Sequence, residues 1–247
     1  MTAEDVRKAM WVYDQKISRH RGLYVVFEGP DGSGKSTLSK NTTEWLGNEL
    51  GGTGVIATRE MGGTAQGATF RQMVLFPKET QSLDLQTETL LCWADRVEGQ
   101  KQVKEWLDAG IAVVQDRTYF STYAYQGMLF GQTPLVNKVH TGLNIMNADM
   151  VFVLDVNPET IIERVGRRVV KGEEDPVGND RMDTMTDIQL KNLCHYYQGI
   201  EYNLPECARV HESAVIHLDG TLPQDKLLEQ VIAHVNRFLD KKEHEAK

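Results

Sequence analysis

The stretch Leu23–Leu38, LYVVFEGPDGSGKSTL, joins an apolar segment to a glycine-rich loop. Its first residues are apolar, β-branched or aromatic, which predicts a buried strand. The loop Gly29–Ser36 then fits the pattern G-x-x-x-x-G-K-[ST] at every fixed position. Glycines allow successive backbone N–H groups to face phosphate oxygens, and a helix that begins near Lys35 adds its positive dipole end. The sequence therefore predicts a nucleoside triphosphate site between a strand and a helix.

The side chains of this loop have separate expected roles. Lys35 can reach the β- and γ-phosphates, and the Ser36 hydroxyl can ligate Mg²⁺. A chance glycine turn is the alternative, and the strand before it and the helix after it argue against that alternative. The residues predicted to hold the nucleotide here are Gly29, Asp31, Gly32, Ser33, Gly34, Lys35, Ser36 and Thr37.

The bulk composition limits the class of protein. The chain has 247 residues, with hydrophobic and charged fractions of 40% and 25%, which suits one packed α/β domain with insertions. The net charge of −8 argues against a surface that coats nucleic acid. No apolar run reaches the length of a membrane span, and the N-terminus shows no signal-peptide core. Cys92, Cys194 and Cys207 lack metal-type spacing and leave an odd count, which favours a reducing compartment. Together with the charge and the lack of a membrane span, this leads us to expect a cytoplasmic protein without membrane or nucleic-acid partners.

Apolar strand segments and helical segments alternate after the phosphate loop. This alternation predicts an α/β fold of the P-loop NTPase type, with a five-stranded parallel sheet and helices on both faces. We expect residues 22–242 to form this domain and residues 1–21 to form an N-terminal helical extension. The later strands are expected at 55–58, 111–115, 150–155 and 214–218, and the helices at 36–50, 64–75, 83–107, up to about 146, from 158, at 186–202 and at 223–239.

A charged segment at about 166–183 interrupts the alternation. It contains Arg167, Arg168 and Lys171 and then a run of glycine, acidic residues and proline, which predicts a mobile lid. A phosphate loop alone leaves GTPases, motor ATPases and kinases open. The sequence has no base-selecting N-K-x-D, and its third strand ends in D-R instead of the D-E of remodelling ATPases. A lid with clustered cations favours phosphoryl transfer between two small molecules, because a closed lid excludes water.

The chain resembles thymidylate kinases over nearly its whole length after residue 22. Five motifs support the resemblance, and they follow one another in the family's order. They are the bacterial-type phosphate loop GPDGSGKST, Thr58–Thr64 for T-R-E-P-G-G-T, Ala94-Asp95-Arg96 for the helix arginine, Asp116–Gly127 for D-R-x-x-x-S-x-x-A-Y-Q-G, and Met150–Val156 with Asp180–Asp183 for the fourth strand and the end of the lid. The resemblance implies transfer of the γ-phosphoryl group of MgATP to dTMP, giving dTDP, by a homodimer.

The resemblance also implies roles around the phosphates. Asp31 would accept a hydrogen bond from the sugar 3′-hydroxyl, and Asp116 would support Mg²⁺ together with Ser36. Forked guanidinium groups suit an acceptor phosphate better than ammonium does. The arginines expected on the acceptor phosphate are Arg59, Arg71 and Arg117.

At the base and sugar, the resemblance implies a second set of contacts. Arg96 and Gln126 would contact the pyrimidine edge, with Ser121 and Thr122 nearby, and Tyr125 would crowd the 2′ position and favour a deoxyribose. The phosphate loop has glycine where animal-type members place an arginine, so the transition-state cation should come from the lid. Beside Lys35 and Arg117, the catalytic candidates are therefore Arg167, Arg168 and Lys171, with Arg181 as a further lid residue on the nucleotide.

Three positions depart from the family pattern. Met61 replaces the proline of the T-R-E-P-G-G turn, and a cis bond before methionine would cost about 2.5–4 kcal/mol, so we expect this loop to be built differently. Cys92 replaces the phenylalanine that stacks on the base, and Thr118 replaces an aromatic residue. We expect either a base pocket that tolerates a larger 5-substituent, or a Trp93 ring that swings in as the stacking group.

Other substrates and classes remain as alternatives. A kinase for another pyrimidine deoxynucleoside monophosphate, such as dUMP or 5-hydroxymethyl-dUMP, would use the same groups. A deoxynucleoside kinase would need a carboxylate base just after the first strand. A nucleotide-dependent switch or regulatory binding module would bind ATP without acceptor-dependent turnover.

Overall fold

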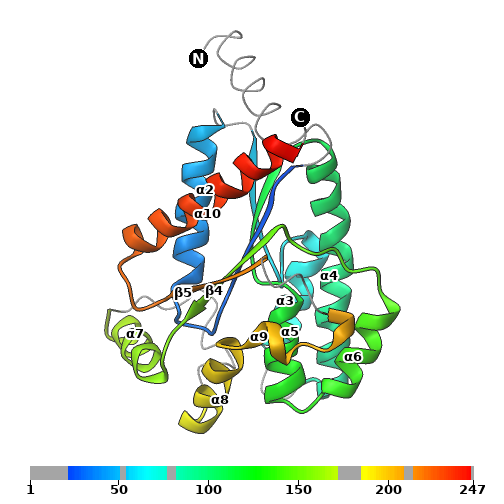
Figure 1. The fold of residues 1–247 in the computed structure, drawn as a ribbon. Helices are drawn as coiled ribbons and strands as arrows, with labels where there is room; N and C mark the ends of the chain where they lie inside the picture. The colour runs from blue at the N-terminus through cyan, green and yellow to red at the C-terminus, as the bar shows by residue number, and fades with distance from the viewer. Residues whose placement is uncertain (1–21, 51–53, 77–81, 172–184, 209–213, 246–247) are drawn as a thin grey trace.

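The computed structural model describes residues 22–50, 54–76, 82–171, 185–208 and 214–245. A parallel sheet of five strands, in the order β2-β3-β1-β4-β5, forms the centre of the molecule (Figure 1). β1 therefore lies in the middle of the sheet, where neighbouring strands and covering helices bury all its residues. The strands are β1 (Tyr24–Glu28), β2 (Val55–Arg59), β3 (Ala112–Asp116), β4 (Met150–Asp155) and β5 (Val215–Asp219).

One face of the sheet packs against two long helices, α2 (Lys35–Glu49) and α10 (Gln224–Glu245), which lie side by side (Figure 1). Side chains alternate between the two faces of a strand, so Val25 and Phe27 of β1 both point toward these helices. They join a core with the buried leucines and valines of the two helices. Those residues are Leu38, Leu46, Leu227, Val231 and Val235.

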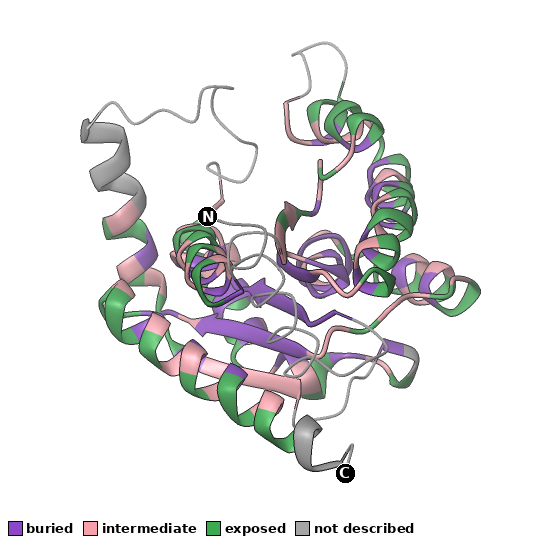
Figure 2. Ribbon diagram, turned by 90° about the horizontal axis from the view of Figure 1, so that it is seen from above, coloured by how far each residue is buried: buried purple, intermediate pink, exposed green. Residues whose placement is uncertain are grey.

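The opposite face of the sheet packs against a larger group of helices. Tyr24 and Val26 point to this side and join a core that contains Trp93 and Leu107 of the longest helix, α4. Buried residues follow the central strands, and exposed residues follow the outer sides of the helices (Figure 2). The helices here are α4 (Leu85–Asp108), α5 (Tyr119–Thr122), the π-helix η1 (Tyr123–Leu129), α6 (Thr133–Gly142) and α8 (Asp187–Tyr197). The remaining elements are α3 (Ala65–Leu75), α7 (Pro158–Lys171), α9 (Ile200–Asn203) and the 3-10 turn η3 (Glu206–Ala208).

The predicted α/β fold and its parallel sheet are confirmed, and the differences concern helix ends. We expected helical segments up to about residue 146, whereas α6 ends at Gly142. The side chain of Gln100 hydrogen-bonds the backbone of Asn144 and Met146 and holds the segment after α6 in a non-helical form. The predicted helix at 186–202 is two helices, α8 and α9, separated by a turn at Gln198 and Gly199.

The start of the predicted lid differs from our expectation. α7 continues to Lys171, so the backbone of Arg167, Arg168 and Lys171 is helical, where we expected an irregular excursion. Residues 172–184, which include Arg181, lie outside the described residues, as does the predicted extension at 1–21. Within the described ranges, no helix is both long and apolar enough to cross a membrane.

Candidate active site

The phosphate loop lies between β1 and α2, as its sequence pattern predicts. Gly32 and Gly34 have φ values of 81° and 95°, in the left-handed region that side chains other than glycine seldom adopt. A Cβ atom on Gly34 would also lie 2.8 Å from Nε2 of Gln224, which belongs to α10. The backbone conformation of the turn therefore requires glycine at both positions, whereas the flexible Gln224 side chain could move aside.

The carboxylate of Asp116, at the end of β3, meets the phosphate loop at the start of α2. Ser36 Oγ donates a hydrogen bond to Asp116 Oδ2 at 2.5 Å. The other carboxylate oxygen, Oδ1, is buried and has no partner within the described part of the chain. A hydroxyl and a carboxylate with a spare buried oxygen fit the sparse protein ligands that Mg²⁺ usually takes beside phosphates. Thr37, the next residue, is exposed on the first turn of α2.

Asp31 lies at the centre of a group of charged and phenolic side chains that joins the phosphate loop to a neighbouring cavity. Its carboxylate accepts a hydrogen bond from Tyr125 Oη at 2.7 Å and pairs with Arg117 Nη2 and, at 3.4 Å, with Lys35 Nζ. Burial would raise the pKa of Asp31, but the cations Arg117 and Lys35 outweigh it and hold that pKa well below the usual range. Burial lowers the pKa of Lys35. Asp31 is therefore a carboxylate, an acceptor of hydrogen bonds only.

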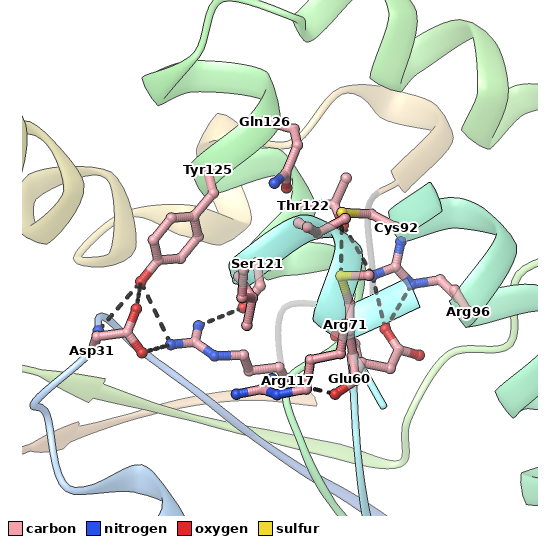
Figure 3. A pocket seen from close by; sticks show the side chains of 14 residues that line it. Asp31, Glu60, Arg71, Cys92, Arg96, Arg117, Ser121, Thr122, Tyr125 and Gln126 are labelled. Carbon is pink, nitrogen blue, oxygen red and sulfur yellow. Dashed lines mark hydrogen bonds and ion pairs between the residues drawn. The ribbon is translucent and has the colours of Figure 1, made fainter. Parts of the chain in front are cut away.

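A cavity lies next to Asp31 (Figure 3). It is formed by α3, α4, the segment from Arg117 to Gln126 and the loop after β2. Most of the residues predicted to bind the acceptor line it. These are Asp31, Arg71, Cys92, Arg96, Arg117, Ser121, Thr122, Tyr125 and Gln126.

Arg117 lies where the cavity meets the phosphate loop, and its backbone has an unusual conformation, with φ at 71°. Its guanidinium group donates to Ser121 Oγ at 2.7 Å and to the backbone oxygen of Gly29 at 3.2 Å. It also lies over the ring of Tyr125, at 5.3 Å from the ring centre. The group is thereby fixed between the phosphate loop and the cavity, where a guanidinium can contact phosphates from both sides.

Glu28 supports Arg117, and the sequence analysis did not identify it. This fully buried carboxylate, at the end of β1, accepts hydrogen bonds from the backbone N–H of Thr118 at 2.6 Å and from Ser121 Oγ at 2.8 Å. Tyr197 of α8 donates to it at 3.3 Å. Burial raises the pKa of Glu28, against the lowering effect of Arg117. Glu28 does not line the cavity, so it holds the Arg117 loop and is not placed as the carboxylate base of a deoxynucleoside kinase.

Arg96, a buried residue of α4, lies at the other end of the cavity (Figure 3). Glu60 accepts from its Nε at 2.8 Å and pairs with its Nη2 at 2.7 Å, and Thr122 Oγ1 accepts from Nη2 at 3.0 Å. Nη1 is buried without a partner in the described part of the chain. Burial raises the pKa of Glu60 to about 7, although Arg96 acts in the opposite direction. Arg96, one of the residues that line the pocket, thus keeps a buried Nη1 that the described residues leave unpartnered.

The cavity wall beside Arg96 contains Cys92 and Met61 but not Trp93. Trp93 does not line the cavity: it is buried in the core, where it packs on His140, and Arg96 lies 4.6 Å from its ring centre. The hypothesis that Trp93 swings in as a stacking ring is therefore not supported. Cys92 does line the cavity, and its Sγ lies 3.5 Å from Sδ of Met61. The peptide bond before Met61 is cis.

The remaining predicted residues are less concentrated at the cavity. Arg71 lines it and donates to the backbone oxygen of Met61 at 3.3 Å. Arg59 is exposed at the end of β2 and is not among the lining residues, so its contact with an acceptor phosphate stays a prediction. Arg164, on α7 just before the charged segment, was not predicted. It bridges Ser33 O at 2.9 Å and Gly220 O at 2.7 Å and so links the phosphate loop to the loop after β5.

The phosphate loop and the cavity adjoin each other at Asp31 and Arg117, so two phosphorylated ligands would meet there. Fold and site together define a P-loop phosphotransferase of the nucleoside monophosphate kinase type. Comparison with known proteins identifies the family. The family model described as thymidylate kinase matches residues 27–197, and the chain belongs to this family.

Individual relatives agree over most of their length. The chain is 31% identical to a thymidylate kinase of Trichormus variabilis over 227 residues, covering 88% of this chain and 99% of the relative. It is 30% identical to a thymidylate kinase of Acaryochloris marina over 229 residues, covering 85% and 94%. The crystal structure of thymidylate kinase from Ehrlichia chaffeensis superposes with a TM-score of 0.60 at 26% identity and covers 86% of this chain and 97% of that one.

Proposed function

We propose that this protein transfers the γ-phosphoryl group of ATP to dTMP and produces dTDP and ADP. The observation that carries the proposal is the junction of Asp31 and Arg117, where the phosphate loop meets a cavity lined by most of the residues predicted to bind the acceptor. An oxygen of the acceptor phosphate forms the new bond to the γ-phosphorus, and the bond to the β–γ bridging oxygen breaks. The acceptor phosphate is itself the nucleophile, so the protein supplies alignment and neutralisation of charge.

The positions of the individual residues support the roles that we propose for them. Lys35 and the backbone of the phosphate loop hold the donor phosphates. Arg117 and Arg71 contact the acceptor phosphate, and Asp31 accepts from the sugar 3′-hydroxyl. Tyr125, whose hydroxyl is directed to Asp31, closes the space around the sugar and favours a deoxyribose.

Ser36 and Asp116 would hold Mg²⁺ beside the donor phosphates, directly or through water. The buried, unpartnered Oδ1 of Asp116 supports this assignment. The ion, when bound, neutralises charge on the phosphate oxygens. Arg167, Arg168, Lys171 and Arg181 remain the candidates for a lid cation, and at least one of them would approach the transferred group in the closed state.

A homodimer is the assembly that we propose, with a cytoplasmic location. Three large apolar side chains on the outer surface of two adjacent helices support an interface between copies of this chain. Leu90 and Val97 of α4 are 49% and 45% exposed, and Met73 of α3 is 43% exposed. Residues seven apart share one side of a helix, so Leu90 and Val97 lie on one surface of α4, and α3, which carries Met73, packs against this helix.

A coupled assay across nucleoside monophosphates, with ATP and Mg²⁺, tests the proposed reaction. We expect ADP formation that depends on dTMP, with far lower rates for purine monophosphates and for thymidine. ATP binding without any acceptor-dependent turnover would indicate a regulatory module. Turnover with thymidine in place of dTMP would indicate a nucleoside kinase.

A further inference from the structure

Two of the chain segments at the end of the cavity around Arg96 are connected by hydrogen bonds. Glu88, Cys92 and Arg96 follow one another at a spacing of four residues, so they share one buried side of α4. Thr122 and Gln126, also four apart, face them from α5 and η1. Arg96 Nη2 donates to Thr122 Oγ1 at 3.0 Å, and Gln126 Nε2 donates to Glu88 Oε1 at 3.3 Å.

The second of these bonds decides which atom Gln126 offers to the cavity. A carboxylate only accepts hydrogen bonds, so Glu88 requires the amide nitrogen of Gln126 on its side. Gln126 lines the cavity, although it is only 5% exposed. Its Oε1 has no hydrogen-bond partner among the residues that the structure describes. The carbonyl oxygen is therefore the group that Gln126 presents, and it is an acceptor.

Arg96 offers the opposite polarity. Glu60 and Thr122 occupy its Nε and Nη2, and the buried Nη1 is left as an N–H donor. An acceptor and a donor at one end of a pocket match the N3–H and O4 groups of a uracil-type base. Cytosine has a bare nitrogen at position 3 and an amino group at position 4, so both contacts would be mismatched. Mismatched buried polar groups are strongly disfavoured.

We infer that Glu88 is a positioning residue that gives the pocket its selectivity for uracil-type over cytosine-type monophosphates. The inference rests on the proposed function and extends it to a residue outside the cavity. Glu88 is 1% exposed and does not line the cavity, so it acts through the Gln126 amide. A neutral amide at position 88 can donate as well as accept. The side-chain amide of Gln126 could then flip and present its NH₂ group to the cavity.

The substitution Glu88→Gln tests this inference, because it changes the polarity and leaves the size almost unchanged. We expect the KM for dTMP to rise about tenfold, with kcat and the KM for ATP within about twofold of wild type. The ratio of kcat/KM for dTMP to that for dCMP should fall about tenfold or more. A purely structural defect would lower kcat/KM for both substrates by the same factor and leave this ratio unchanged.

Thr89→Val is the matched control. Thr89 is the buried neighbour of Glu88, and its hydroxyl donates to the backbone oxygen of Leu85 within α4. We expect this variant to keep the wild-type ratio. If Glu88→Gln fails to fold in a thermal unfolding measurement, Glu88→Met tests the same point with an apolar side chain, and the ratio should fall again.

The outcomes separate the inference from the proposed function. A folded Glu88 variant with the wild-type ratio of dTMP to dCMP would overturn the role of Glu88 alone. A wild-type protein that phosphorylates neither monophosphate would contradict the proposed reaction. A fall in the ratio in the Glu88 variant, with the Thr89→Val ratio unchanged, supports both.

Discussion

Arg117 shows how much of the site depends on one side chain. It contacts the phosphate loop at Gly29, the carboxylate of Asp31 and the Ser121 hydroxyl, all from one guanidinium group. Lysine has no planar fork and cannot make these contacts simultaneously. Residues with several contacts of this kind are the ones whose replacement changes catalysis and not only binding.

Replacing Arg117 with lysine should lower kcat/KM for the acceptor by about 10²–10³, the range for loss of a preorganised electrostatic group. The KM for ATP should change much less, because Lys35 and the backbone of the loop still hold the donor. Steady-state kinetics with each substrate varied in turn measures both effects. Arg237→Lys, an exposed change on α10, is the control. An Arg117→Lys variant with wild-type kcat/KM would rule out the proposed role.

Cys92 is the residue on which our expectation for the substituent at position 5 of the base depends. The pocket wall beside Arg96 consists of the sulfur atoms of Cys92 and Met61, without an aromatic ring. Burial raises the pKa of Cys92 to about 12, so its thiol is neutral. In the binding mode that we propose, these polarisable side chains, smaller than a phenylalanine ring in the case of Cys92, would leave space next to O4 of the pyrimidine, which is where a 5-substituent projects.

We therefore expect the wild-type protein to use 5-hydroxymethyl-dUMP with a kcat/KM within about tenfold of that for dTMP. Cys92→Phe should reduce the value for 5-hydroxymethyl-dUMP about tenfold more than the value for dTMP, since crowding by a few atoms has effects of this size. Parallel assays with dTMP, dUMP and 5-hydroxymethyl-dUMP measure the difference. Strict preference of the wild type for dTMP would contradict the enlarged pocket.

At the scale of elements, His217 connects three parts of the fold. Its ring nitrogens lie 2.9 Å from Asp155 at the end of β4 and 3.0 Å from Glu201 on α9, while His217 itself belongs to β5. Hydrogen bonds to Asp155, with a smaller contribution from Glu201, raise the pKa of His217 to about 9, although burial acts in the opposite direction. The charged ring therefore joins β5 to its neighbours at neutral pH.

The raised pKa gives a definite sign for the dependence of stability on pH. Stabilisation by His217 should be complete below pH about 6.5, the pKa of an unfolded histidine, and should be lost as pH rises through about 9. Urea unfolding at pH 6.5 and 9.5 should show a decrease on the order of 2 kcal/mol in wild type that His217→Gln lacks. Equal pH dependence in the two proteins would show that another group is responsible.

At the scale of the whole molecule, the exposed apolar side chains on α3 and α4 predict the assembly. A monomer should have a mass of 27.9 kDa in light scattering, and we expect the wild type to have about twice that value. The double substitution Leu90→Asp with Val97→Asp should yield monomers, because it buries two charges in the interface. Ile188→Asp, an equally apolar and more exposed position on α8, should leave the dimer intact. A monomeric wild type at micromolar concentration would contradict the proposed interface.

The sequence by itself determined the order of the strands and helices along the chain and the position of the phosphate loop. Hydrophobic periodicity and glycine spacing are local properties, so a short window of residues is enough to recognise them. The individual candidates around Arg96 and Arg117 came from motifs of the same local kind. Helix ends were less certain, as α6 shows, because a side chain 44 residues away, Gln100, holds the segment that follows α6.

Only the tertiary structure decided which buried carboxylates serve the site. Glu28 meets Thr118 from 90 residues away, and Glu88 meets Gln126 from 38 residues away. No local pattern distinguishes these glutamates from solvated ones on a helix or at the end of a strand. Their importance arises because burial leaves a carboxylate with a few fixed donors in place of water, and those donors are brought together only when the sheet and its helices pack. The same packing placed Trp93 in the core and left Cys92 at the pocket wall.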